Sequence, residues 1–511
     1  MTHDLADGGW HRLHPATPLL RGGIVLIAIL GFVVANFRER LIDWLFGAPE
    51  LPGDPLQTAY ERGQLGWAAL VVAGLLLLGI ASFFLSWRLH TFRIGDDVVE
   101  VRSGVLFRTH RRARIDRIQG VAIDRPFFAR LFGTARVDIS VAGQDAKVQL
   151  AYLGGADADA LRGEVLRLAS GARAAEAQVD TAHPSPPGER EGIVNQRVRE
   201  LLAPELDPSL AAPESVVKIP PGRLIGSLVL SGFTVMVVLA VALLLTTSML
   251  GRREFLAFIV LPGLVAAIGY YVNRFTKTLR YSIAGTPDGI RVGSGLLSTN
   301  NDTLPPGRVH AIEVSQPLLW RPAGWWMIRI NRAGAAGEAT AQASTTMLPV
   351  GTIDDARRVL ELLVPGMAGS ETGRLVDAGL TARRGEGFTD APRRARLLRP
   401  FSWRRTGFAR GEAALLLRGG FVWRRLVVVP LARVQSIRVS QGPVRRGLGL
   451  AELTVHTVAG PVRPELAVVD REVAREQFEE WSAAVVIAID SDRSHRWAER
   501  PDDERGRSDE T

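Results

Sequence analysis

Residues 102–133 read RSGVLFRTHRRARIDRIQGVAIDRPFFARLFG, and two further stretches of the chain align with them without a gap. Residues 293–324 read GSGLLSTNNDTLPPGRVHAIEVSQPLLWRPAG, and residues 418–449 read RGGFVWRRLVVVPLARVQSIRVSQGPVRRGLG. One unit present in three copies predicts three related modules. The positions that define this repeat signature are Gly104, Arg117, Gln119 and Gly133, then Gly295, Arg308, His310 and Gly324, and finally Gly420, Arg433, Gln435 and Gly449.

Each copy predicts a series of short strands followed by one helix. Apolar and polar residues alternate at 433–439, which is the period of a half-buried strand. A tight turn that needs a positive φ is expected at the first shared glycine of each copy. The other predicted strands are 91–94, 135–141, 279–283, 326–330, 407–410 and 451–456. The predicted closing helices are 157–168, 353–362 and 470–485, with Asp157, Asp354 and Asp470 placed to cap them.

Four apolar runs interrupt the otherwise polar chain, at residues 19–37, 66–86, 224–250 and 255–271. A membrane-spanning helix needs about 20 apolar residues, so we predict four transmembrane helices paired as two hairpins. A buried core helix is the alternative for each run, and a cleaved signal peptide is a further alternative for the first. No A-x-A-like cleavage site follows the first run and a second run comes soon after, which favours a retained anchor.

The distribution of basic residues predicts the orientation of these hairpins. The loop of the first hairpin is mixed in charge, whereas its outer flanks carry only basic groups near the apolar runs, and basic flanks stay cytoplasmic. The second hairpin has Arg252 and Arg253 in its turn, but its flanks carry more basic residues than the turn does. We expect a multi-pass protein of the cell membrane, with the modules and both termini in the cytoplasm.

A series of short strands followed by one C-terminal helix is the order of elements in a pleckstrin-homology (PH)-like β-barrel. With the hairpins and the R-[IV]-[QH]-x-[IV] strand of the repeat, the chain resembles bacterial PH-domain family 2, the YdbS/YdbT-like membrane proteins. The resemblance covers residues 19–168 and 224–485. The second copy departs from it by an insertion around Thr286-Pro287 and by His310 in place of Gln. The resemblance implies membrane-anchored PH-like modules and does not supply a ligand.

We therefore expect a membrane protein with four transmembrane α-helices in two hairpins and three PH-like β-barrel modules, each closed by a C-terminal helix. Residues 169–217 are rich in Ala, Pro and Glu, which is typical of a flexible linker. The expected organisation is an N-terminal segment at 1–18, a hairpin at 19–86, a module at 87–168, the linker at 169–217, a hairpin at 224–273, a module at 274–365, a linker at 366–400, a module at 401–485 and a disordered tail at 490–511.

The sequence offers no recognisable catalytic chemistry. The absence of cysteine excludes disulfides, thiolate nucleophiles and cysteine zinc sites. His11 and His14 are close together but have no further ligand nearby, and there is no HExxH, P-loop or G-x-S-x-G motif. We expect no catalytic residue, metal or cofactor and therefore no enzyme, with an unrecognised active site as the alternative.

Clusters of arginine are the strongest functional signal in a chain of formal net charge +9. Each basic residue near an anionic lipid surface contributes on the order of 1 kcal/mol to binding. A solvated face is the alternative, and nucleic acid is not expected because aromatic residues do not alternate with the arginines. The candidate lipid contacts are Arg108, Arg111, Arg112, Arg114, Arg393, Arg394, Arg396, Arg399, Arg404 and Arg405. The shared Arg117, Arg308 and Arg433 are interpreted as structural, with contact to an anion or a partner as the alternative.

These observations favour a non-enzymatic, membrane-anchored scaffold whose cytoplasmic modules bind protein partners or the anionic membrane surface. Self-association through exposed strand edges is a further expectation. A role in envelope stress or resistance to membrane-active agents rests on the resemblance alone. The alternative is a component of a membrane transport or export system. The last three apolar runs have no ionisable residue in their interiors, which favours anchors over a transport path.

Overall fold

The computed structural model describes residues 8–15, 87–169, 217–332 and 345–492, together with scattered residues between 17 and 85. Gaps within these ranges fall at 96–97, 105–107, 142–146, 250–253, 287–288, 297, 306, 365–366, 368 and 383. The chain divides into two compact units. Unit 1 comprises Met1–Ile115, Arg125–Val137 and Val148–Leu161, and unit 2 comprises Asp116–Asp124, Asp138–Lys147 and Arg162–Thr511.

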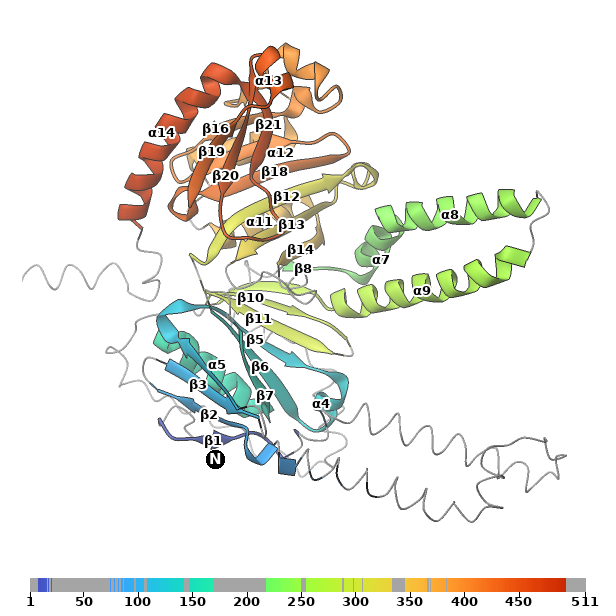
Figure 1. Ribbon diagram of the computed structural model, residues 1–511, viewed down its shortest axis with the longest axis vertical. Coiled ribbons are helices and arrows are strands. Elements are labelled where there is room, and N and C mark those ends of the chain that lie inside the picture. The colour runs from blue at the N-terminus through green and yellow to red at the C-terminus, as the bar shows by residue number, and fades with distance from the viewer. Residues whose placement is uncertain are drawn as a thin grey trace, which may run out of the picture. The chain divides into compact units, whose positions relative to one another are not determined.

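Unit 1 contains a four-stranded antiparallel sheet (Figure 1). Its order is β1 (His11–Arg12), β2 (Thr91–Ile94), β3 (Val98–Ser103) and β4 (Thr109–Arg114). The predicted strand at 91–94 is confirmed as β2, and Phe92 and Ile94 are fully buried by its alternation. The first repeat copy continues through η1 (Ile115–Arg117), β5 (Ile118–Arg125), α4 (Phe127–Leu131), β6 (Thr134–Val141), β7 (Lys147–Gly154) and the predicted closing helix, α5 (Gly155–Ala169).

In unit 2, strands of consecutive repeat copies join in one sheet. Strand β5 of the first copy neighbours β11 of the second, in the order β5-β11-β10-β9-β8. The bounds of these strands are β8 (Val217–Lys218), β9 (Ser282–Thr286), β10 (Gly289–Ser294) and β11 (Thr299–Leu304). Gly120 of β5 allows β11 to lie close to it, since a Cβ at this position would lie 3.1 Å from the Thr303 carbonyl oxygen.

The second and third copies are joined in the same way, through β12 and β18. Ile312 faces Val428 and Val314 faces Leu426 across this pair. The sheet order is β14-β13-β12-β18-β17-β16-β15. Its strands are β12 (Val309–Pro317), β13 (Trp326–Arg332), β14 (Thr346–Gly351), β15 (Thr389–Asp390), β16 (Gly407–Arg410), β17 (Ala414–Gly419) and β18 (Trp423–Pro430). A third sheet follows, in the order β19 (Ser436–Ser440), β20 (Leu450–His456) and β21 (Glu465–Asp470).

The joined sheet separates two hydrophobic cores of unit 2. Ile312 and Val428 belong to the first core, which α11 (Ile353–Leu363) and α12 (Glu371–Thr381) help to close. Val427 and Ala311 point to the opposite face and belong to the second core, which also contains Trp481 of α14 (Arg471–Asp490). The predicted helices at 353–362 and 470–485 are thus confirmed as α11 and α14. The expected fold of three PH-like β-barrel modules, each closed by its own C-terminal helix, is wrong as a description of the sheets, because each sheet at a junction takes strands from two copies.

The segment predicted as a linker at 366–400 holds α12, β15 and η5 (Arg393–Leu397), and η6 (Trp403–Arg405) follows it. Arg405 is buried there and donates hydrogen bonds to the carbonyl oxygens of Gly379, Leu380 and Ala382 at the C-terminal end of α12. The fully buried Arg418 pairs with Asp390 at 2.6 Å. The predicted linker at 169–217 and the tail at 490–511 lie largely outside the described residues.

The prediction of four transmembrane helices is wrong. Among the described residues, no single helix is long and apolar enough to cross a membrane. Helices α7 and α8, which are bent relative to each other, reach the necessary length and apolar composition only when they are taken together. The run at 224–250 is divided into α7 (Pro221–Val229) and α8 (Gly232–Met249), with a bend of 46°. Ser231 accepts a hydrogen bond from the Thr234 amide at 3.3 Å, as an N-cap does, so a new helix begins there.

The run at 255–271 lies in α9 (Glu254–Thr278), whose last turns are polar and carry Lys277. Helices α8 and α9 lie side by side as a hairpin (Figure 1). The first predicted hairpin, at 19–86, lies almost entirely outside the described residues.

Candidate membrane-binding surface

The segment after the shared strand exposes apolar side chains in every repeat copy. In the first copy it is α4, with Phe127 and Phe128 exposed, and in the second it is η4 (Leu318–Trp320), with Leu318 and Leu319 exposed. In the third copy it is α13 (Pro443–Gly447), where Val444 is exposed. These residues occupy equivalent repeat positions. Exposed apolar side chains at one position of a repeated module indicate an interaction surface.

The turn after Gly420 extends this surface in unit 2. Gly420 has a φ of 83°, and a Cβ there would overlap the Trp423 carbonyl oxygen. The turn can therefore form only with glycine at this position. It leaves Phe421, Val422 and Trp423 exposed at the start of β18. Trp423 pairs with Pro317 of β12, so the turn lies next to the beginning of η4.

The segment before β16 exposes two more apolar side chains, one of which lies against this turn. Phe401 is 74% exposed and Leu397 is 71% exposed. The ring of Phe401 lies 5.7 Å from the ring of Phe421, which ties the two segments together. The buried Ala395 and Trp403 fix the segment to the module beneath. We call the five exposed residues Leu397, Phe401, Phe421, Val422 and Trp423 the tip.

Exposed arginines occur in the same segment as Leu397 and Phe401, and one further arginine contacts the turn. Arg393, Arg396 and Arg399 are exposed, and no ion pair involves them in the part of the chain that the structure describes. Arg404 lies over the Trp403 ring at 5.6 Å, and Arg321 lies over the Phe421 ring at 5.7 Å and donates to the Phe421 carbonyl oxygen. Apolar side chains accompanied by arginine suit the boundary between lipid headgroups and acyl chains, where aromatic side chains gather and anionic lipids attract positive charge.

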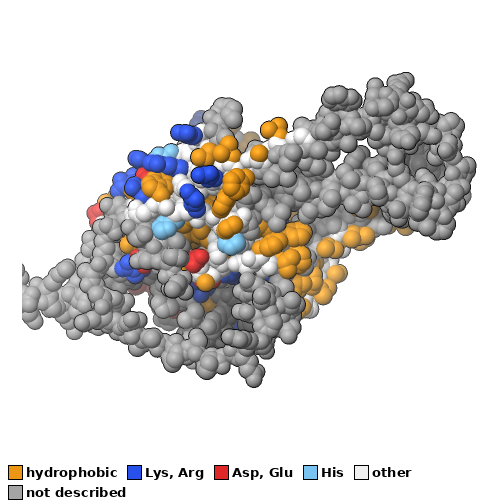
Figure 2. Space-filling model, turned by 90° about the horizontal axis from the view of Figure 1, so that it is seen from below, with side chains coloured by type: hydrophobic (Ala, Val, Ile, Leu, Met, Phe, Trp, Pro, Cys, Tyr) orange, Lys and Arg blue, Asp and Glu red, His pale blue; other side chains and the backbone are white. Residues whose placement is uncertain are grey.

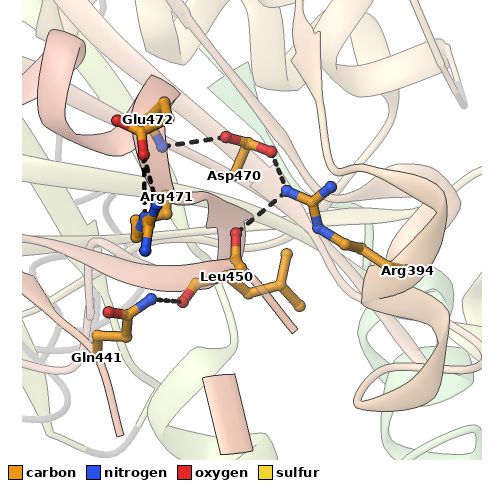
Figure 3. Close-up of polar contacts among 7 residues, drawn as sticks. Arg394, Gln441, Leu450, Asp470, Arg471 and Glu472 are labelled. Atoms are coloured by element: carbon orange, nitrogen blue, oxygen red, sulfur yellow. Dashed lines mark hydrogen bonds and ion pairs between the residues drawn. The ribbon is translucent and has the colours of Figure 1, made fainter. Parts of the chain in front are cut away.

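Two of the predicted lipid contacts are instead engaged within the third module. Arg394 points to the carboxylate of Asp470 and also donates to the Gly449 carbonyl oxygen at 3.1 Å (Figure 3). Asp470 at the same time caps α14, since it accepts from the Glu472 amide at 3.0 Å. Arg405 is the buried residue that binds the end of α12. Arg405 is thus buried within the domain, and the exposed Arg394 is held by contacts within it.

The predicted contacts of the first copy lie in unit 1, on β4 and, for Arg108, at the residue before it. Arg108, Arg111, Arg112 and Arg114 are all exposed. Arg112 pairs with the buried Glu100 at 2.8 Å, and Glu100 also pairs with Arg93 and His110. Figure 2 shows Lys and Arg side chains close to hydrophobic ones on one face of the molecule.

The repeat signature falls on the turns and on the shared strand. All six shared glycines have positive φ: Gly104, Gly133, Gly295, Gly324, Gly420 and Gly449. Arg433 pairs with Asp492 at 2.8 Å, while Arg117 is exposed and Arg308 lies near His310. Burial lowers the pKa of His310 to about 4, helped by the charges of Arg433 and Arg308. Gln119 is buried, whereas Gln435 is exposed.

Comparison with protein families identifies the modules. The model of the bacterial PH domain matches residues 26–169, 225–365 and 391–485. The chain belongs to the bacterial PH domain family. The three bacterial PH domains contain the three repeat copies, which confirms the resemblance drawn from the sequence, and repeated domains of this kind suggest a scaffold or binding role. Comparisons with curated proteins and with solved structures found no match.

Sequence reasoning found the arginines near the tip but missed its apolar half. The signal was present, since Phe421, Val422 and Trp423 directly follow a turn glycine, and Leu397 and Phe401 stand among arginines. Apolar residues in such places are normally assigned to strands or to the core. The described residues contain no group of three or more His, Asp or Glu that could hold a metal ion.

Proposed function

We propose that this bacterial PH domain protein is a non-enzymatic scaffold that binds the anionic surface of the cell membrane from the cytoplasmic side. The observation that carries the proposal is the tip, whose five residues are exposed and apolar, together with the exposed Arg396, Arg399 and Arg404 of the segment that contributes Leu397 and Phe401. The apolar side chains enter the interfacial layer and the arginines bind lipid phosphates. The exposed apolar segments α4, η4 and α13 repeat the same chemistry in each domain.

The energies of the two parts are comparable. Three arginines close to an anionic leaflet contribute about 3 kcal/mol, since each contributes about 1 kcal/mol near the surface. That contribution falls with ionic strength because the Debye length shortens from about 10 Å at 0.1 M salt to about 3 Å at 1 M. Apolar burial is insensitive to such screening. Binding should therefore have a salt-sensitive part and a part that persists.

Co-sedimentation of the full chain with vesicles tests the proposal. Vesicles of phosphatidylcholine alone are compared with vesicles that also contain phosphatidylglycerol, each over a salt series. The parent chain should prefer anionic vesicles, and the preference should fade as salt rises. Simultaneous Arg396→Gln, Arg399→Gln and Arg404→Gln should remove most of this preference. The affinity for anionic vesicles at low salt should fall on the order of 100-fold, because three contributions of about 1 kcal/mol are lost.

The matched control is a second triple variant that loses the same three positive charges outside the tip. Arg471, Arg475 and Arg410 are exposed and lie outside the tip, so their replacement by Gln should leave the preference for anionic vesicles nearly unchanged. Equal losses in both triple variants would show a non-specific charge effect and defeat the proposal. No preference for anionic vesicles at low salt would turn the tip into a candidate protein-docking surface.

A further inference from the structure

Strand β19 occupies in the third domain the place that β5 and β12 occupy in the first two. By the repeat alignment, Ile437, Arg438 and Val439 correspond to Ile312, Glu313 and Val314 of β12. Strand β5 neighbours β11 and β12 pairs with β18, so each is covered on one edge by a strand of the next domain. In the third sheet, β20 lies on one side of β19, and no strand among the described residues lies on the other.

The uncovered edge differs from its covered counterpart in burial. Val314 of β12 is fully buried, whereas the equivalent Val439 is 36% exposed. Ile437 packs against the third domain's core from a half-buried position. The edge therefore offers the same apolar face as β12 without the strand that covers it there.

The backbone groups at this edge also have no strand partner in the part of the chain that the structure describes. The Val455 amide of β20 donates to the Pro464 carbonyl oxygen on the β21 side, at 2.9 Å. Val455 faces Ile437, and Leu453 faces Val439. Because bonding alternates along an antiparallel pair, the N–H and C=O groups of Ile437 and Val439 point away from β20. They are the groups that an added strand would bind.

The register of the β12–β18 pair indicates the side chains that such a strand needs. Val428 and Leu426 face Ile312 and Val314, so apolar residues belong opposite Ile437 and Val439. Val427 faces Glu313, whose place Arg438 takes in the third domain. Arg438 is exposed and has no ion-pair partner among the described residues. A carboxylate belongs opposite it.

The chain's own equivalent strand does not fit this description. Strand β4 aligns with β18, and His110, Arg111 and Arg112 stand at the three positions that would face Val439, Arg438 and Ile437. Arg111 would face Arg438, and like charges directly opposite each other are destabilising. The charges thus disfavour a head-to-tail chain of identical copies.

We propose that β19 is a docking edge for a β-strand of a different protein, one that carries an acidic residue between two apolar residues. The strand pairs antiparallel with β19, as β18 pairs with β12, and places its carboxylate opposite Arg438. It extends the third sheet and covers Val439. The proposal concerns the third domain alone and is independent of lipid binding by the tip.

A labelled peptide tests the docking edge with the full chain. Its sequence is that of residues 421–430, FVWRRLVVVP, with Val427→Glu; a second peptide carries Val427→Lys. Fluorescence anisotropy should give tighter binding of the Glu peptide by about 1.4-fold to fivefold, which is the range for one opposite-charge cross-strand pair. Arg438→Glu in the chain should reverse that preference.

Two controls keep the test sharp. Val439→Pro removes only an outward amide, which an edge strand tolerates, and should abolish binding of both peptides while the fold is retained. Hydrogen exchange should slow at residues 436–440 when the Glu peptide is added. Binding that survives Val439→Pro, or that leaves exchange at 436–440 unchanged, would overturn the proposal. Self-association of the chain that Val439→Pro abolishes would also overturn it, because the occupant would then be a second copy.

Discussion

Replacing the two most exposed apolar residues of the tip should weaken membrane binding without harming the fold. Burial of a large apolar side chain stabilises by about 1.5–3 kcal/mol. Phe401 is 74% exposed and Leu397 is 71% exposed, so each has about three-quarters of this energy available for insertion into lipid. Simultaneous Leu397→Ser and Phe401→Ser should therefore cost about 2–4 kcal/mol of binding, which is about 30-fold to 700-fold in affinity.

The assay is vesicle co-sedimentation at high salt, where the arginines contribute least and the apolar part is isolated. Thermal unfolding should change little, because replacing exposed residues outside special backbone conformations changes stability by about 0.5 kcal/mol or less. The control is Val486→Ser with Ile487→Ser, since these α14 residues are also exposed but lie outside the tip. An intact double tip variant that sediments like the parent would refute the reasoning.

Three further predictions concern the fold. Gly420→Ala should destabilise the third domain by about 1–3 kcal/mol, because its φ is 83°, whereas Gly442→Ala, at a φ of −77° with open space around it, should be nearly neutral in a thermal scan. Arg418→Met should cost about 1.5–3 kcal/mol, because Asp390 loses its 2.6 Å partner and keeps Arg384 at 3.3 Å, and adding Asp390→Asn should recover part of the loss in denaturant titrations. The lowered pKa of His310, about 4 against an ordinary 6.5, means that the unfolded chain binds a proton first, so the free energy of unfolding should fall as pH drops from about 6.5 to 4. His310→Gln should flatten that slope, and an unchanged slope would contradict the assignment.

Local structure was predictable from the sequence where one physical signal dominated. The order of the repeat unit predicted the strand at 91–94, which is β2, and the acidic start at 470 predicted α14, which Asp470 caps. The shared glycines predicted the turns, because a positive φ leaves few alternatives. Repetition of the unit then predicted three domains, as the family comparison found.

The organisation of those domains was not predictable from the same signals. Ile312 and Val428 alternate within their own strands, but nothing local indicates that β12 and β18 pair across two repeat copies. Apolar content alone also failed for 224–250, because Ser231 and Gly232 divide the run into two helices. Arg405 and Arg418 were equally hidden, since a buried arginine and an exposed one look alike in a sequence.

A single label on the tip tests the central claim most directly. The chain has no cysteine, so Phe401→Cys creates a unique site for an environment-sensitive fluorophore. With phosphatidylglycerol-containing vesicles, emission from position 401 should shift to the blue and become protected from an aqueous quencher. The same label at Glu476→Cys, an exposed position of α14, should report water throughout. A chain that binds these vesicles while the label at 401 remains in water would contradict the account.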